Sequence, residues 1–97
     1  MEMRIIKLDA SQWSNIIEFY DAVCAGIGAP SWHGRSLNAF IDSMVYGGIN
    51  EIDTPYKIVF VGTAKASDAI RSDIHEFIEA INNAQGSDNQ IDFEICE

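Results

Sequence analysis

The segment KIVFV at residues 57–61 decides the fold, because it is short, almost continuously apolar and rich in β-branched residues. Such a run is typical of a strand that is buried on both faces of a parallel sheet. Two further strands are predicted at residues 4–8 (RIIKL) and 91–95 (IDFEI), and the second alternates apolar and acidic residues like a strand with one face in solvent. We expect the most apolar strand to be the central one.

Apolar residues at helical spacing fill the chain between these strands. They predict a helix over residues 12–26, a helix over 35–46 and a third helix that begins at Ser67 and ends before a loop at 83–90. Asp9 and Ser11 are the N-cap candidates of the first helix. The three predicted buried stripes are Trp13, Ile16, Ile17, Tyr20, Val23, Cys24 and Ile27; Leu37, Phe40, Ile41, Met44 and Val45; and Ile70, Ile74, Phe77, Ile78 and Ile81.

Glycines mark the ends of the first two helices. Gly26 and Gly28 are predicted to stop the first helix, and Gly47 and Gly48 the second. The order is then strand, two helices, strand, helix, strand, which predicts an α/β fold with a three-stranded parallel sheet in the order 1-2-3 and crossover helices on one face. A chain of 97 residues forms one domain, residues 1–97, and is too small for an elaborate enzyme with a cofactor cleft.

The charge balance restricts the kinds of partner. Fifteen acidic residues against six basic ones give a formal charge of −9, which disfavours direct binding to nucleic acid because phosphate affinity comes from Lys and Arg. A basic protein partner is favoured, although acidity by itself also serves solubility. No apolar run has the length of a signal peptide or a membrane span, so we expect a cytoplasmic protein that does not contact the membrane.

The cysteines and histidines favour neither a disulfide framework nor a metal site. Cys24 and Cys96 are the only cysteines, and we expect two reduced thiols. His33 and His75 are far in sequence from each other and from both cysteines, whereas metal ligands cluster at short spacings. We expect no metal and no cofactor.

The segment PSWHGRSLNAFIDSM at residues 30–44 is the candidate functional site. Arg35, Asn38 and Asp42 fall on the side of the predicted helix away from its apolar stripe, directly after the aromatic residues Trp32 and His33. One interpretation is an ordinary solvated helix face. The other is a surface that a buried stripe holds in place and presents to a partner.

This segment resembles the barstar family of intracellular inhibitors of the ribonuclease barnase. Members carry an aromatic pair, a glycine, a motif of the type Asn/Ser-Leu-Asp/Asn-Ala-Leu/Phe, and an acid one turn later. The matching residues here are Trp32, His33, Gly34, Ser36, Leu37, Asn38, Ala39, Phe40 and Asp42. The likeness extends more loosely over most of the chain, but the connection over residues 47–55 is longer than usual and the link before the last helix is too short for the extra helix of some members.

The resemblance implies a barstar fold and a non-catalytic ribonuclease inhibitor, for example an immunity protein against a secreted or contact-delivered toxic ribonuclease. It implies that Asp42 occupies the substrate phosphate position among the catalytic cations of the enzyme, and that Glu79 adds a peripheral contact. Asn38 stands where many members have a second acid, which suggests a partner other than barnase. The predicted partner-binding residues are Trp32, His33, Gly34, Arg35, Asn38, Ala39, Asp42, Tyr46 and Glu79.

Several alternatives stay open. One of Trp32 and His33 is expected in the core and the other on the surface, and Arg35 is expected to pair with Asp42 or to meet an acid on the partner. A barstar-fold module for a non-nuclease partner is an alternative function. A small enzyme using Asp42, His33 or Glu79 is a weaker one, because no phosphate loop or nucleophile motif accompanies these residues. The free protein is expected to be a monomer.

Overall fold

The three strands form one parallel sheet. The computed structural model describes residues 3–46, 49–52, 54–86 and 90–97. Its strands are β1 (Arg4–Asp9), β2 (Tyr56–Val61) and β3 (Ile91–Ile95), in the order β1-β2-β3. Both pairings are parallel, with Ile58 aligned between Ile6 and Phe93. The predicted α/β class, strand order and central strand are confirmed.

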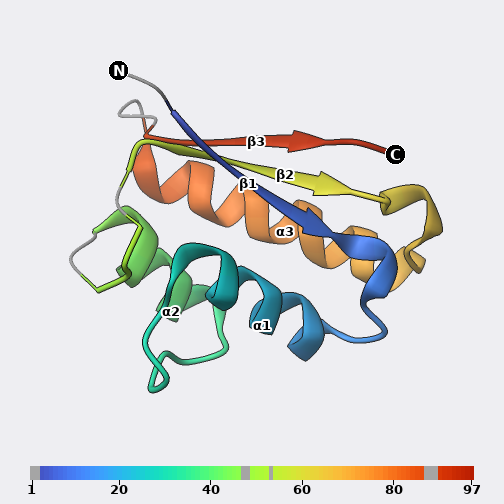
Figure 1. Cartoon of the computed structure of the whole chain (residues 1–97), viewed down its shortest axis with the longest axis horizontal. Coiled ribbons are helices and arrows are strands. Elements are labelled where there is room, and N and C mark those ends of the chain that lie inside the picture. Colours follow the sequence, from blue (N-terminus) through green and yellow to red (C-terminus); the bar gives the residue numbers. More distant parts are fainter. Residues whose placement is uncertain (1–2, 47–48, 53, 87–89) are drawn as a thin grey trace.

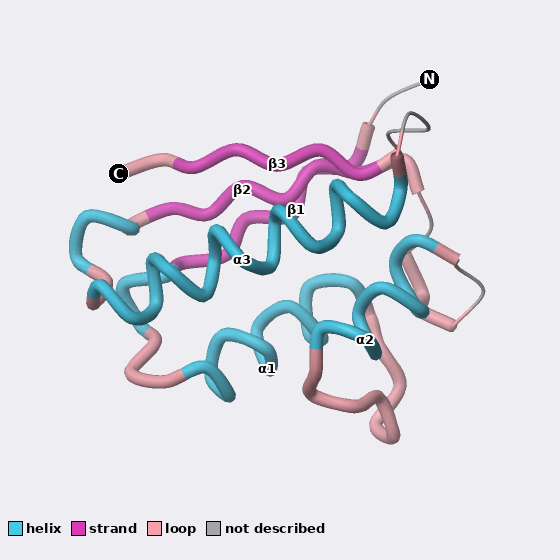
Figure 2. The backbone as a smooth tube through the Cα atoms, turned by 180° about the vertical axis from the view of Figure 1, so that it is seen from behind, coloured by secondary structure: helices cyan, strands magenta, loops and turns pink. Residues whose placement is uncertain are grey.

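All helices lie on one side of this sheet (Figures 1 and 2). They are α1 (Ile16–Ile27), the short α2 (Leu37–Phe40) continued by the π-helical η2 (Ile41–Val45), and α3 (Asp68–Gln85). The 3-10 turns η1 (Ala10–Gln12) and η3 (Thr63–Lys65) follow the carboxyl ends of β1 and β2. None of the described helices combines the length and apolarity that a membrane span requires.

The expectation that β2 is buried on both faces was wrong, because helices cover only one face of the sheet (Figures 1 and 2). Tyr56, Ile58 and Phe60 belong to the core, so the residues that alternate with them point to the open face. Val59 is only 6% exposed there, because it lies in register between Lys7 of β1 and Glu94 of β3. The ammonium of Lys57 contacts the Glu94 carboxylate at 2.6 Å. Long charged side chains therefore shield this apolar position without a helix.

Four fully buried phenylalanines connect the layers of the core. The ring centroid of Phe77 on α3 lies 5.4 Å from that of Phe19 on α1 and 5.5 Å from that of Phe40 on α2, both in edge-on geometry. Phe19 also lies 5.9 Å from Phe60 on β2. Such aromatic pairs add to the stabilisation that burial provides. The short helix α2 is thus attached to the central core and does not stand alone on the surface.

The first helix begins later than predicted. Asp9 accepts from the Ser11 N–H and caps η1, whereas Asn15 accepts from the Glu18 N–H and caps α1. Two predicted core residues, Ile16 and Ile17, are exposed, and the buried position in that turn is taken by Phe19. The prediction was wrong at this end because the chain uses its first polar cluster for a separate turn.

The C-terminal end of α1 is hydrogen-bonded to the connector that follows η2. Gly28 caps α1 with φ 68°, the left-handed conformation that glycine adopts without strain, so Gly28 and not Gly26 ends the helix. The carbonyls of Gly28 and Ile27 accept from the N–H groups of Glu51 and Ile52 at 3.0 and 3.2 Å. The predicted stops at residues 47 and 48 lie outside the described residues.

The last helix begins as predicted and ends one turn later. Ser67 accepts from the Ile70 N–H and caps α3, and the predicted stripe is buried except for the half-buried Ile78. The helix continues to Gln85, so the expected loop from residue 83 was placed too early; residues 87–89 lie outside the described part of the chain. The Gln85 amide explains the longer helix, because it bonds to both the N–H and the C=O of Ile91 on β3, at 3.1 and 2.9 Å.

Candidate partner-binding surface

The helical segment formed by α2 and η2 has one side in the core and the other in solvent. Phe40 and Met44 are buried, and the other stripe residues, Leu37, Ile41 and Val45, are half-buried against the core. The predicted stripe is therefore confirmed. Asn38 and Asp42 are exposed, as predicted from their place away from it. The helix starts at Ser36, whose hydroxyl accepts from the Ala39 N–H at 3.2 Å.

The π-helical turn η2 buries Ser43, a residue that the sequence pattern does not predict to be buried. Ser43 is buried beside the exposed Asp42. A π-helical turn is wider than an α-helical one, and such turns are frequent at functional sites. A lone serine in an amphipathic pattern carries no sequence signal for this geometry, because serine is most often exposed. Its role becomes visible only through its hydrogen-bond partner.

The loop over residues 30–36 places its two aromatic residues on opposite sides. Trp32 is 71% exposed, whereas His33 is 6% exposed, with its ring centroid 4.9 Å from that of Phe40. The expectation that one of the two is in the core and the other on the surface is confirmed. The His33 ring cannot touch a partner in this arrangement, so any role of this side chain acts through the loop.

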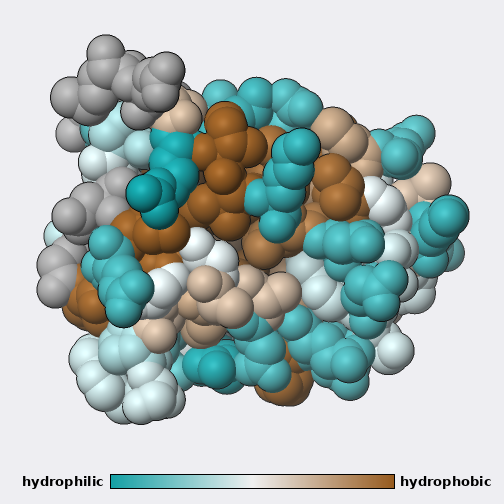
Figure 3. All heavy atoms as spheres, in the orientation of Figure 1, coloured by the Kyte–Doolittle hydropathy of each residue, from teal (hydrophilic) through white to brown (hydrophobic). Residues whose placement is uncertain are grey.

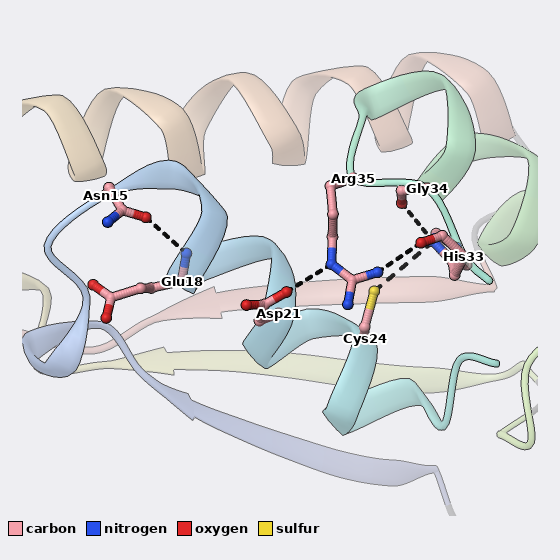
Figure 4. A network of polar contacts seen from close by, with 7 residues as sticks. All are labelled: Asn15, Glu18, Asp21, Cys24, His33, Gly34 and Arg35. Atoms are coloured by element: carbon pink, nitrogen blue, oxygen red, sulfur yellow. Dashed lines mark hydrogen bonds and ion pairs between the residues drawn. The ribbon is translucent and has the colours of Figure 1, made fainter. Parts of the chain in front are cut away.

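Both ring nitrogens of His33 are hydrogen-bonded (Figure 4 shows its Nδ1 contacts). Nδ1 lies 2.7 Å from the Gly34 carbonyl oxygen, and a carbonyl only accepts, so Nδ1 carries the proton in the neutral ring. Nε2 then accepts from the Ser43 hydroxyl at 2.7 Å. The Cys24 sulfur lies 3.8 Å from Nδ1, and burial raises the pKa of this thiol. The ring therefore joins the loop to η2.

Arg35 pairs with Asp21 on α1, so the expected pair with Asp42 was wrong, and contact of Arg35 with an acid on a partner stays a prediction. Its Nε donates to the Asp21 carboxylate at 2.7 Å, and its Nη1 donates to the His33 carbonyl at 2.6 Å (Figure 4). The hydrogen bond to Asp21 raises the pKa of Arg35 further. Arg35 does not reach Asp42, because the loop turns back over α1. Its positive charge is balanced within the protein before any partner binds.

Tyr46 and Glu79 are both exposed, the first directly after η2 and the second on α3. Tyr46 follows η2 and is 74% exposed. Glu79 lies on α3 and lines a shallow groove between α3 and α2, whose walls are Leu37, Glu76, Glu79, Ala80 and Asn83. Within the described ranges, no ion pair involves Asp42, Glu76 or Glu79. Exposed acids without an ion-pair partner among the described residues therefore stand on η2 and α3.

The surface combines exposed acids with exposed aromatic side chains. Figure 3 shows one face of the molecule, on which hydrophobic patches lie between hydrophilic side chains. Among the described residues there is no group of three or more His, Cys, Asp and Glu side chains arranged for a metal ion. The protein is therefore a small acidic α/β domain with an exposed acid and exposed aromatic residues around a helical segment that is packed on the core.

The family follows from the comparison with known proteins. The family model described as Barstar (barnase inhibitor) matches residues 3–96. The chain therefore belongs to the barstar family, whose members are ribonuclease inhibitors and not enzymes. A search of curated proteins found no match.

Proposed function

We propose that this protein inhibits a basic ribonuclease by inserting the inhibitory surface, defined as Trp32, Asn38, Asp42 and Tyr46, into the active site of the enzyme. The observation that carries the proposal is Asp42. Its side chain is exposed and without an ion-pair partner among the described residues, and it stands on a helical segment whose other side is anchored in the core.

The chemistry of a ribonuclease active site suits this surface. A carboxylate surrounded by guanidinium and ammonium groups forms charge-assisted hydrogen bonds in a desolvated pocket, where interface hot spots arise. Trp32 and Tyr46 supply rigid aromatic contact area at low entropic cost. Glu76 and Glu79 on α3 lie at the rim, where charge mainly accelerates association.

The partner differs from barnase in the groups that face Asn38. An amide at this position accepts hydrogen bonds without adding charge, so an enzyme with fewer cations there is the better match. The natural partner is a basic ribonuclease toxin, secreted or delivered by contact, and this protein is its cytoplasmic, monomeric immunity partner. Gly34 and Ala39 pack against each other, since a Cβ at Gly34 would lie 3.3 Å from the Cβ of Ala39, and both belong to the surface that we expect the enzyme to contact.

The proposal is tested by comparing Asp42→Ala with Asp92→Ala, a control acid on the open face of the sheet. The probes are barnase and any basic ribonuclease encoded beside this gene. Asp42→Ala should weaken binding by roughly 2 to 5 kcal/mol, mainly through faster dissociation, a range that comes from buried charge pairs in interfaces including barnase–barstar. Asp92→Ala should leave dissociation unchanged.

Two results would contradict the proposal. If Asp42→Ala binds the ribonuclease and protects RNA from cleavage as well as the parent protein does, the enzyme does not dock on this surface. If the parent protein binds no ribonuclease but captures a non-nuclease protein, and Asp42→Ala abolishes that capture, the surface serves a regulatory partner instead.

A further inference from the structure

We propose that His33 and Arg35 are positioning residues that fix the Trp32 loop before a partner binds, an inference that rests on the proposed function. The four side chains His33, Ser43, Arg35 and Asp21 are called here the loop clamp. They attach the loop over residues 30–36 to η2 on the inside and to α1 on the outside (Figure 4 shows the outer attachment).

The inner half of the loop clamp is buried. His33 and Ser43 are 6% and 3% exposed, and the bond between them, at 2.7 Å, spans ten residues of sequence. Each side chain removed from water needs its partner, because an unpaired buried polar group is unfavourable. The π-helical turn at η2 contains Ser43 and leaves the adjacent Asp42 exposed. The hydrogen bond between His33 and Ser43 therefore links the loop over residues 30–36 to the turn that carries Asp42.

The outer half of the loop clamp lies at the surface. Arg35 connects Asp21 on α1 with the main-chain carbonyl of His33. The two halves thus hold the same residue, whose ring is fixed from inside and whose carbonyl is fixed from outside. Exposed ion pairs contribute little to global stability, so the effect of Arg35 is expected in the position of the loop and not in the unfolding midpoint.

The functional consequence concerns Trp32, which directly precedes His33. A side chain that is 71% exposed and sits on an ordered loop loses less freedom on binding than the same side chain on a mobile loop. Preorganisation of this kind strengthens binding without a new contact. Loss of either half of the loop clamp should weaken ribonuclease binding about tenfold, although neither His33 nor Arg35 needs to touch the enzyme.

The test uses two variants and a matched control. His33→Phe keeps a ring against Phe40 but removes both ring hydrogen bonds, and Arg35→Gln removes the outer ion pair. Arg71→Gln is the control, because Arg71 also pairs with an acid, Asp68, and also donates to main-chain carbonyls, those of Thr63 and Ala66. The loop is monitored by amide ¹⁵N order parameters, and binding by association and dissociation rates with barnase and with the neighbouring ribonuclease.

The expected result is a fall of the loop order parameters from about 0.85 to below about 0.6 in both clamp variants, with weaker binding and no change for Arg71→Gln. A charge exchange supplies a partial rescue: Asp21→Arg and Arg35→Asp should each disorder the loop, and the double variant should recover part of the loop order and binding, because it restores the ion pair but a carboxylate at position 35 cannot donate to the His33 carbonyl. A purely structural role of these residues would not produce this rescue at an unchanged unfolding midpoint.

Two results would overturn the inference. Loop order parameters that stay near the parent value in both clamp variants show that the loop is held by other contacts. A disordered loop with unchanged binding rates shows that the loop clamp does not act on the inhibitory surface. If the parent protein binds no ribonuclease, the proposed function fails and the binding part of the inference with it, while the order parameters still decide whether the loop clamp exists.

Discussion

Phe40 and Asp42 lie two residues apart in one short helical segment, the first in the core and the second in solvent. Phe40 is fully buried and packs on Tyr20 and Phe77, with ring centroids 5.1 and 5.5 Å away. Asp42 is exposed. Stability and partner binding are therefore separated at the level of single residues, and substitutions at the two positions should affect different measurements.

Phe40→Ala should lower the free energy of unfolding by about 3 to 5 kcal/mol, because it removes burial and leaves a cavity among the core rings. Asp42→Ala should leave the denaturant midpoint nearly unchanged, since an exposed side chain on a helix surface contributes little. Urea unfolding of both variants checks the pair. The reverse order would mean that the two sides of the helical segment are assigned wrongly.

The two thiols should differ in reactivity. Both cysteines are free; Cys24 is buried and Cys96 is half-buried. Burial raises the pKa of Cys24, and the hydrogen bond to Glu94 raises the pKa of Cys96, so each is mostly a thiol at neutral pH and alkylation should accelerate as the pH rises. Iodoacetamide labelling followed by mass spectrometry should modify Cys96 first. In denaturant without reductant both should react, and a stoichiometric disulfide would contradict the expected cytoplasmic location.

At the scale of elements, the Gln85 side chain at the end of α3 takes the place of a strand partner at the first residue of β3. The Gln85 amide donates to the Ile91 carbonyl and accepts from its N–H, as the main chain of a neighbouring strand would. In the described sheet β3 has only β2 as a strand partner. The amide therefore closes part of an edge whose free groups would otherwise invite pairing with another chain.

Gln85→Leu should destabilise the protein by about 1 to 3 kcal/mol, because it leaves main-chain groups at Ile91 without their partner. Hydrogen exchange at the Ile91 amide should accelerate relative to Ile58 in the centre of the sheet. The same change at the exposed Gln12 is the control and should have little effect. Unchanged protection at Ile91 would show that the amide is dispensable for the edge.

The elements themselves were largely predictable from the sequence, and their polar connections were not. The run KIVFV, the alternation of IDFEI and the stripe ending in Ile81 follow from periodicity, and all three elements are where they were expected apart from the last turn of α3. Pairs such as Arg35 and Asp21, 14 residues apart, follow from the course of a loop that no periodic pattern describes. The surface role of Asp42 comes from the family likeness and awaits measurement.

For the whole molecule, the formal charge of −9 should steer a basic partner toward the inhibitory surface. Glu79→Gln removes a rim charge beside α2 and should lower the association rate about two- to threefold at low salt, with little change in dissociation. The effect should shrink near 0.15 M salt, where the Debye length is about 8 Å. Stopped-flow association at two ionic strengths measures it.

Asp68→Asn is the comparison for this prediction, because Asp68 begins α3 and is already paired with Arg71. Its removal should change the association rate less than Glu79→Gln does. A larger effect at Asp68 would place the approach path of the partner near the carboxyl ends of the strands instead of over α2.

The open face of the sheet gives this protein a side that the proposed inhibition does not use. Helices cover only the opposite face, and the segment of α2 and η2 lies beyond them, away from the bare strands (Figure 2). An anchor fixed to the bare strands would hold the protein on a solid support with the segment of α2 and η2 turned toward the solution (Figure 2). A ribonuclease could then be captured from a mixture without competing with the anchor for space.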